Sequence, residues 1–174
     1  MTKKYELVLD DTIGFWGWKL FRIRALISFG SVEVGDLGGY IEKEDNLSHD
    51  GNAWVSGNAK VWGDAEVSGN AWVSGDAKVS GNAEVSGNVW VSGDAWVSGD
   101  AKVSELGDII VFKNHWSSGR HFTYTKSNKM WKAGCFYGTG QELIEKAYRD
   151  SEKSGNHYKA CVDFVESLEK LNDQ

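Results

Sequence analysis

The chain has 174 residues, with 25 acidic and 19 basic side chains, a formal net charge of −6 and a sequence pI near 5.2. This balance excludes the basic face that a phosphate-backbone binder needs, so we expect no nucleic-acid partner. No stretch approaches the roughly 18 apolar residues of a membrane span. The 2 cysteines are too few for a disulfide framework, which favours reduced thiols and a cytoplasmic location.

Residues 1–50 are predicted to form a small β cap and a lead-in to the repeat. The stretches YELVLDD and WKLFRIRALISF are rich in β-branched and aromatic residues with partial alternation, which is typical of strands. The lead-in carries Leu37, Ile41 and Leu47, which we expect to cover the open end of the structure that follows.

Residues 51–104 consist of nine consecutive hexads of the form G-[ND]-[AV]-x-V-[SW]. The Ala and Val positions are two residues apart, so in an extended segment they point to one side while x points to the other. Gly tolerates positive φ and Asn or Asp tolerates it better than most residues, so these residues mark the corners. A strand this short must pair with copies of itself stacked above and below, which predicts a repeat architecture.

This pattern resembles the hexapeptide repeat of left-handed parallel β-helices. The resemblance implies a mainly β fold in which three hexads make one triangular coil of eighteen residues, giving three coils here. The variable letters then sort into three columns. These are Trp54, Trp72 and Trp90 on one wall; Lys60, Lys78 and Trp96 on the second; and Glu66, Glu84 and Lys102 on the third.

Residues 105–174 are predicted to form an α+β cap of three strands and two helices. The expected strands are DIIVFKN, RHFTYT and KMWKAGCF. Thr139 to Glu142 has the spacing of a capping box, which predicts a helix to about Glu152, and a second apolar periodicity predicts a helix from about Asn156 to Leu171. A cap is expected because the open strand edges of a solenoid template further stacking.

A second resemblance extends over most of the chain. The segments LFRIRAL, GDLGGYIEKEDNLSHDGNAWV and GCFYGT resemble a group of uncharacterised hexapeptide-repeat proteins found widely in bacteriophage and prophage genomes. The resemblance implies a viral origin and expression in the cytoplasm of a bacterial host cell. It supplies no catalytic residue.

One functional hypothesis is a hexapeptide-repeat acyltransferase, because many proteins with a left-handed β-helix are enzymes of this kind. Such enzymes place a general-base His beside the coenzyme cleft, and carbonic anhydrases of this fold need three zinc-binding His. The repeat contains no His, so we expect no metal, no cofactor and no catalysis. His49, at the entry to the first coil, is the one candidate base, and a structural or exposed role is favoured for it.

The aromatic and cationic side chains are the candidate binding residues. The tryptophan wall and Trp96 predict either a subunit interface, in a homo-oligomer expected to be a trimer, or a stacking platform for a flat ligand. Lys60 and Lys78 would supply positive charge for a phosphate. A hairpin with Trp116, Arg120 and His121 is a further candidate for gripping an anion, and an ordinary exposed hairpin is favoured over it.

The sequence therefore predicts a non-catalytic, oligomeric phage protein that works by binding. The use that the phage resemblance favours is inhibition of a host defence system, by sequestering a small signalling nucleotide or by binding a defence protein. An acyltransferase-like enzyme is the alternative, and a structural spacer or virion component is the third hypothesis.

Overall fold

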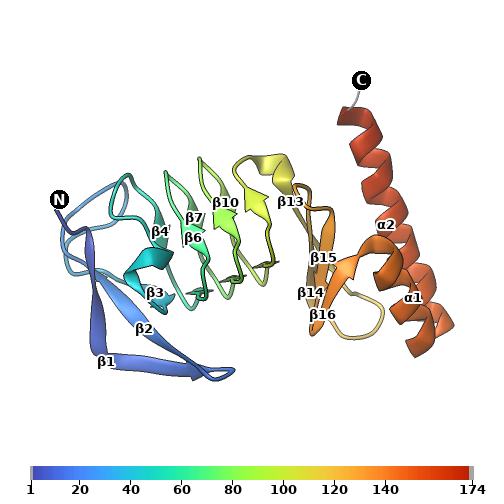
Figure 1. Cartoon of the computed structure of the whole chain (residues 1–174), viewed down its shortest axis with the longest axis horizontal. Coiled ribbons are helices and arrows are strands. Elements are labelled where there is room, and N and C mark those ends of the chain that lie inside the picture. Colours follow the sequence, from blue (N-terminus) through green and yellow to red (C-terminus); the bar gives the residue numbers. More distant parts are fainter. Residues whose placement is uncertain (1, 173–174) are drawn as a thin grey trace.

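The hexads form the centre of an elongated molecule in the computed structural model, which describes residues 2–172 (Figure 1). Each hexad contributes a turn at its Gly and Asn or Asp, followed by a two-residue strand. The nine strands are β4 (Trp54–Val55), β5 (Lys60–Val61), β6 (Glu66–Val67), β7 (Trp72–Val73), β8 (Lys78–Val79), β9 (Glu84–Val85), β10 (Trp90–Val91), β11 (Trp96–Val97) and β12 (Lys102–Val103).

The corner glycines are needed for two reasons, which Gly69 illustrates. Its φ is +65°, a conformation that residues with a Cβ rarely adopt. A Cβ at this position would also lie 2.9 Å from the backbone nitrogen of Gly87 in the next coil. The stacking distance between coils thus leaves no room for a side chain at the corner.

The strands stack in parallel into three walls, which confirms the mainly β left-handed helix. The first wall is β4, β7 and β10; the second is β5, β8 and β11; the third is β6, β9 and β12. Trp54 pairs with Trp72 and Lys60 pairs with Lys78, so the columns are those that an eighteen-residue turn predicts.

The number of coils is corrected from three to about four. Strand β3 (Leu37–Ile41) pairs in parallel with β5, and Leu47 bridges to Val67, so the lead-in forms an additional coil above the first hexads. Tyr40 pairs with Lys60, which makes this coil two residues longer than the others. The extra residues are His49 and Asp50, which lie between Ser48 and Gly51. In the repeat that follows, the Ser at the end of a hexad is followed directly by the Gly of the next hexad.

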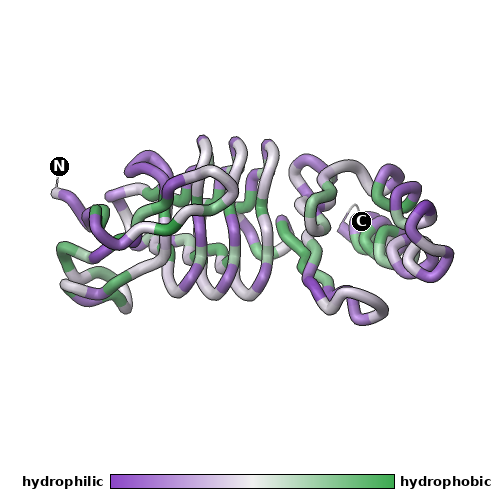
Figure 2. Tube along the Cα trace, turned by 90° about the horizontal axis from the view of Figure 1, so that it is seen from below, coloured by the Kyte–Doolittle hydropathy of each residue, from purple (hydrophilic) through white to green (hydrophobic). Residues whose placement is uncertain are grey.

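The interior is lined by the Ala and Val positions, and all of them are at most 2% exposed. Figure 2 shows the stacked coils from a second side, coloured by hydropathy. Ile41 and Leu47 cover the first end of this core as expected, and Ile109 packs against the other end. Leu37 does not contribute, since it is 55% exposed.

Polar side chains close the ladder at both ends, and the sequence did not reveal them. At the first end Lys4 Nζ donates to the carbonyl of Ala53 (2.6 Å), and Asn46 Nδ2 donates to that of Ala65 (2.9 Å). At the other end Thr123 Oγ1 accepts from the backbone N–H of Trp96 (3.1 Å), and Ser127 Oγ accepts from that of Lys102 (2.8 Å). These contacts satisfy backbone groups that would otherwise form open edges.

The N-terminal cap is a long antiparallel hairpin of β1 (Tyr5–Phe15) and β2 (Trp18–Ala25). Strand β2 pairs with β3, so the hairpin continues the sheet of the second wall. Its two turn residues both have positive φ, Trp16 at 50° and Gly17 at 85°. In Figure 1 the tip extends away from the first coils, along the underside of the prism toward the C-terminal cap.

The C-terminal cap has four strands where three were expected. They are β13 (Ile109–Lys113), β14 (His121–Thr125), β15 (Met130–Ala133) and β16 (Phe136–Thr139). The stretch expected as one strand, KMWKAGCF, turns at Gly134, whose φ is +58°, and so forms two strands. The helices α1 (Gly140–Asp150) and α2 (Glu152–Asn172) pack on this sheet, and Thr139 and Glu142 form the expected capping box. Short 3-10 helices span Glu44–Asn46 and Leu106–Asp108.

Candidate functional site

A cleft of about 420 Å³ lies where three parts of the chain meet. The hairpin tip contributes Phe15 and Trp16, and the second wall contributes Lys78 and Trp96. Loops and strands of the C-terminal cap contribute Arg120, His121 and Lys132. We call this space the cleft.

Aromatic rings form one side of the cleft around Trp96. Its ring centroid lies 5.6 Å from that of Trp16 and 6.0 Å from that of Trp62, both in edge arrangements. Phe15 contacts Trp62 in the same way at 5.1 Å. Trp96 is held in place because its Nε1 donates to Ser80 Oγ (3.2 Å) in the coil before it. The cleft therefore presents a fixed aromatic surface.

Two lysines lie over the faces of these rings. Lys132 Nζ is 4.2 Å from the centroid of Trp96, and Lys78 Nζ is 5.5 Å from it. Nearby, Lys60 Nζ is 5.4 Å from the centroid of Phe15. Such cation–π contacts stabilise a cation weakly when it is exposed and more strongly when it is desolvated.

The charges of these cations are poorly compensated. Burial lowers the pKa of Lys132, and burial together with the neighbouring Lys78 lowers the pKa of Lys60. Within residues 2–172, no carboxylate lies within 4.0 Å of the charged nitrogens of Lys60, Lys78, Arg120 or Lys132. The carboxylate in the cleft, that of Asp94, is 3.0 Å from His121 Nδ1. A bound anion would supply the missing countercharge.

The structure brings some of the predicted site residues together and separates others. Lys78, Trp96, Arg120 and His121, from two distant segments, all line the cleft, and Lys60 lies beside it. Trp116 does not join them, because its ring stacks on His157 at 4.7 Å and its Nε1 donates to Ser154 in the C-terminal cap.

The tryptophan column on the first wall is not one continuous surface. Trp54 is 2% exposed, since Tyr5 and Phe29 pack against it, so it is closed to a partner or a ligand. Trp72 is half-buried, and its Nε1 donates to Ser56 Oγ (3.1 Å). Trp90 alone of the three is largely exposed, at 70%. Trp72 thus repeats the bond between coils that Trp96 makes on the second wall.

The cleft residues that sequence reasoning missed include Phe15, Trp16 and Lys132. The first two lie in a hairpin whose direction no local pattern predicts, and the third lies on a strand of the cap. The positive φ of Trp16 is a local strain of the kind that gathers at functional sites. The Trp16–Gly17 pair between two strand patterns is the local signal that could have indicated a turn there.

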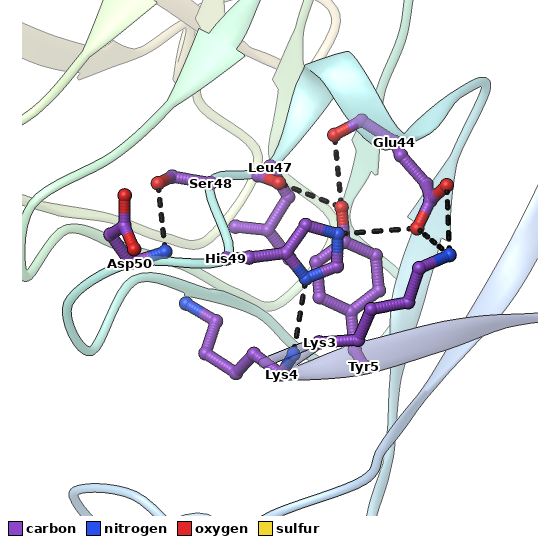
Figure 3. Close-up of polar contacts among 8 residues, drawn as sticks. All are labelled: Lys3, Lys4, Tyr5, Glu44, Leu47, Ser48, His49 and Asp50. Atoms are coloured by element: carbon purple, nitrogen blue, oxygen red, sulfur yellow. Dashed lines mark hydrogen bonds and ion pairs between the residues drawn. The ribbon is translucent and has the colours of Figure 1, made fainter. Parts of the chain in front are cut away.

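His49 lies at the first end of the prism and does not line the cleft. Both of its ring nitrogens contact neighbouring residues (Figure 3). Its Nδ1 accepts from the backbone N–H of Lys4 (3.1 Å), so its Nε2 carries the hydrogen and faces Glu44 Oε1 at 3.2 Å. The ring stacks on Tyr5 with centroids 4.2 Å apart. Both ring nitrogens of His49 are thus engaged by residues of the N-terminal part of the chain.

The buried groups around His49 have displaced pKa values. Burial raises the pKa of Tyr5, whose hydroxyl donates to the carbonyl of Leu47 (2.7 Å). The hydrogen bond from Lys3 lowers the pKa of Glu44, and His49 adds to this effect. Burial lowers the pKa of Lys4 to about 8. These groups join the N-terminal strand to the end of the prism.

No protein-family model matches the chain, and no curated protein matches it in sequence. Among residues 2–172 there is no cluster of three or more His, Cys, Asp or Glu side chains arranged to hold a metal ion. Neither α1 nor α2, the helices of this described part, is long and apolar enough to cross a membrane. The cleft, where Lys78, Trp96, Arg120 and His121 come together, is the candidate site.

Proposed function

We propose that this chain is a binding protein for a small, flat, anionic ligand of the nucleotide class, held in the cleft. The observation that carries the proposal is Lys132, a partly buried cation with no carboxylate partner, fixed over the face of Trp96. A desolvated charge is unfavourable unless it is paired, so the site favours a ligand that brings an anion to an aromatic surface.

A nucleotide meets both requirements of the cleft. Its base can stack on the exposed ring of Trp16, and stacking of one base on an aromatic side chain contributes about 1–3 kcal/mol. Its phosphate can accept hydrogen bonds from Lys78, Lys132 and Arg120, and bonds to charged groups contribute about 1.5–3 kcal/mol each. The volume of about 420 Å³ falls within the range of small-molecule sites.

Nucleotide titration by calorimetry tests the proposal. We expect the nucleotides UMP, AMP and ADP to bind more tightly than the nucleoside adenosine and more tightly than inorganic phosphate. Lys132→Met, which keeps the stem and removes the charge, should weaken nucleotide binding about tenfold, a loss of about 1.4 kcal/mol. The matched control Lys170→Met, on the exposed last turn of α2, should leave it unchanged. Equal affinity in both variants would refute the assignment of the cleft.

The resemblance to phage hexapeptide-repeat proteins supports a use for such binding. The proposed role is that of an anti-defence inhibitor in the cytoplasm of a bacterial host, which removes a signalling nucleotide by holding it intact. Protein isolated from infected or expressing cells should then release an unmodified nucleotide on heating, identified by mass spectrometry. Binding of a host defence protein instead would appear as a stable complex that Lys132→Met does not dissolve.

One observation favours the enzyme alternative, an acyltransferase-like activity. His121 and Asp94 form a pair in the cleft, and a carboxylate that orients an imidazole is an arrangement found in general bases. Incubation with acyl-coenzyme A decides between the two. We expect no turnover from the wild type; turnover that His121→Gln abolishes would overturn the binding-protein proposal.

A further inference from the structure

A second cavity of about 200 Å³ adjoins the cleft. The two spaces share three lining residues, Arg120, His121 and Gly134. Gly134 lies in the turn between β15 and β16, and a Cβ built on it would meet no heavy atom within 4 Å. The two cavities therefore lie side by side, and Gly134 adds no side chain between them.

The second cavity has a different chemical lining from the cleft. Its lining residues include Asp150 and four with hydroxyl groups, each of which also takes part in one hydrogen bond within the cap: Ser117, Ser118, Ser154 and Tyr158. Asp150 pairs with Lys146 at 3.2 Å and is still more than half exposed, so its remaining lone pairs face solvent. Hydroxyl and carboxylate groups suit a ligand that is itself rich in hydroxyl groups, such as a sugar.

Arg120, which lines both cavities, has the side chain best suited to donate hydrogen bonds to an anion. The guanidinium of Arg120 has five N–H donors in a planar fork, and within residues 2–172 it has no side-chain hydrogen bond and no ion pair. Such a fork binds phosphate oxygens in pairs. A phosphate placed here would connect a base in the cleft with a second group in the adjoining cavity.

Size makes the second cavity an extension rather than a separate site. Sites for drug-sized molecules have volumes of about 300–1,000 Å³. The cleft alone reaches this range, and the second cavity alone does not. One ligand that occupies both spaces accounts for their contact and for their different chemistry.

We infer, resting on the proposed function, that the ligand has two parts: an aromatic base joined through phosphate to a hydroxyl-rich unit, as in a nucleoside diphosphate sugar. The base stacks against Trp16, the exposed ring of the cleft, the phosphates lie at Arg120, and the sugar occupies the cavity bordered by Ser117 and Asp150. The second cavity is thus the specificity site, which separates such conjugates from simple nucleotides.

Calorimetry with matched pairs of ligands tests this inference. The pairs are ADP with ADP-ribose and UDP with UDP-glucose, each measured on the full chain. We expect the sugar conjugate of at least one pair to bind about tenfold more tightly than its parent nucleotide. Ser117→Tyr should remove that advantage and leave the affinity for the parent nucleotide unchanged, since an exposed Ser117 tolerates a ring that fills the cavity while its backbone N–H keeps its bond to Asn114.

The matched control is Ser167→Tyr, which adds the same ring at an exposed position of α2 outside both cavities. It should change none of the affinities. Equal binding of parent and conjugate by the wild type would overturn the two-part ligand while leaving the proposed nucleotide site in place. Failure of all four ligands to bind the wild type would overturn both.

Discussion

The first and second walls of the prism are made from the same repeat and carry tryptophan in both, yet they end up with different surfaces. On the first wall Trp54 is buried under Tyr5 and Phe29, while Trp90 at the far end is open. On the second wall Trp96 lies in a cleft formed by the hairpin tip and the C-terminal cap.

The difference shows that the repeat provides only a regular scaffold. Both Trp72 and Trp96 donate their indole N–H to a Ser of the preceding coil, at 3.1 and 3.2 Å. This common bond is structural. What makes Trp96 part of a site is the non-repeat chain laid beside it, Trp16 from one end and Lys132 from the other. The flanking segments, not the coils, therefore distinguish a site from a wall.

The largest expected effect comes from a change that removes the scaffold beneath both walls. Val73→Asp would place an unpaired charge in an interior where Val73 is 0% exposed. Uncompensated buried charges destabilise by about 3–5 kcal/mol, so we expect incomplete folding or a large fall in the denaturant midpoint. Glu84→Gln, at an outward position of the same repeat, is the control and should be nearly neutral. Equal midpoints for the two variants would contradict the fold.

The comparison itself is tested by Trp96→Ala beside Trp72→Ala. Each removes a half-buried indole and its bond to a Ser, so we expect each to lower the unfolding free energy by about 2 kcal/mol. Only Trp96→Ala should also weaken nucleotide binding, by about tenfold, which titration calorimetry would measure. Loss of binding in both variants would mean that the cleft depends on the stability of the prism rather than on the contacts of Trp96.

The ends of the two walls differ as well, and pH distinguishes them. Strand β3 closes the second wall, whereas Lys4 closes the first by donating to the carbonyl of Ala53. Burial lowers the pKa of Lys4 from 10.5 to about 8. Between these values the unfolded chain binds more protons than the folded chain, so the contribution of Lys4 makes the protein more stable as the pH rises.

We expect this contribution to reach about 2 kcal/mol between pH 8 and pH 10. Burial raises the pKa of Cys161 and of Tyr5, which acts in the opposite direction, so the useful quantity is the difference from Lys4→Met in urea unfolding at each pH. The unfolding free energy of the wild type should increase relative to that of Lys4→Met as the pH rises. Parallel curves would show that the ammonium of Lys4 is solvated.

The sequence predicted the walls well because the hexad is a local code. Its two-residue spacing identifies Ala and Val as the interior, and its glycines identify the corners, so the columns follow from pairing alone. The insertion of His49 and Asp50 hid the additional coil, because the hexads before it have lost the Gly, Ala and Val signals. Lys60, Lys78 and Trp96 could be predicted as candidate binding residues because the same repeat places them in one outward column.

The cleft could not be predicted to the same extent, because it depends on contacts between segments far apart in the chain. Lys78 and Arg120 come together only when the cap folds against the last coil, where Thr123 accepts from the backbone of Trp96. Trp16 reaches the site through a hairpin whose bend depends on an irregularity between Val8 and Thr12. Neither direction is coded in a short window of sequence.

The smallest expected change in stability belongs to the open end of the first wall. Trp90 is 70% exposed and lies 6.3 Å from Trp72, so these two rings form the remaining apolar part of the column. The predicted homo-oligomer, expected to be a trimer, would use this part rather than the buried Trp54.

Trp90→Glu should change the unfolding free energy of the chain by no more than about 0.5 kcal/mol, since surface substitutions are usually within this limit. In sedimentation at micromolar concentration the wild type should be larger than the variant, because a charge opposed to its symmetry-related copy would disrupt the contact. Glu66→Gln, on the third wall, is the control and should sediment as the wild type does. A wild type that sediments as a monomer would exclude the interface and leave the second wall, with its cleft, as the surface through which the chain acts.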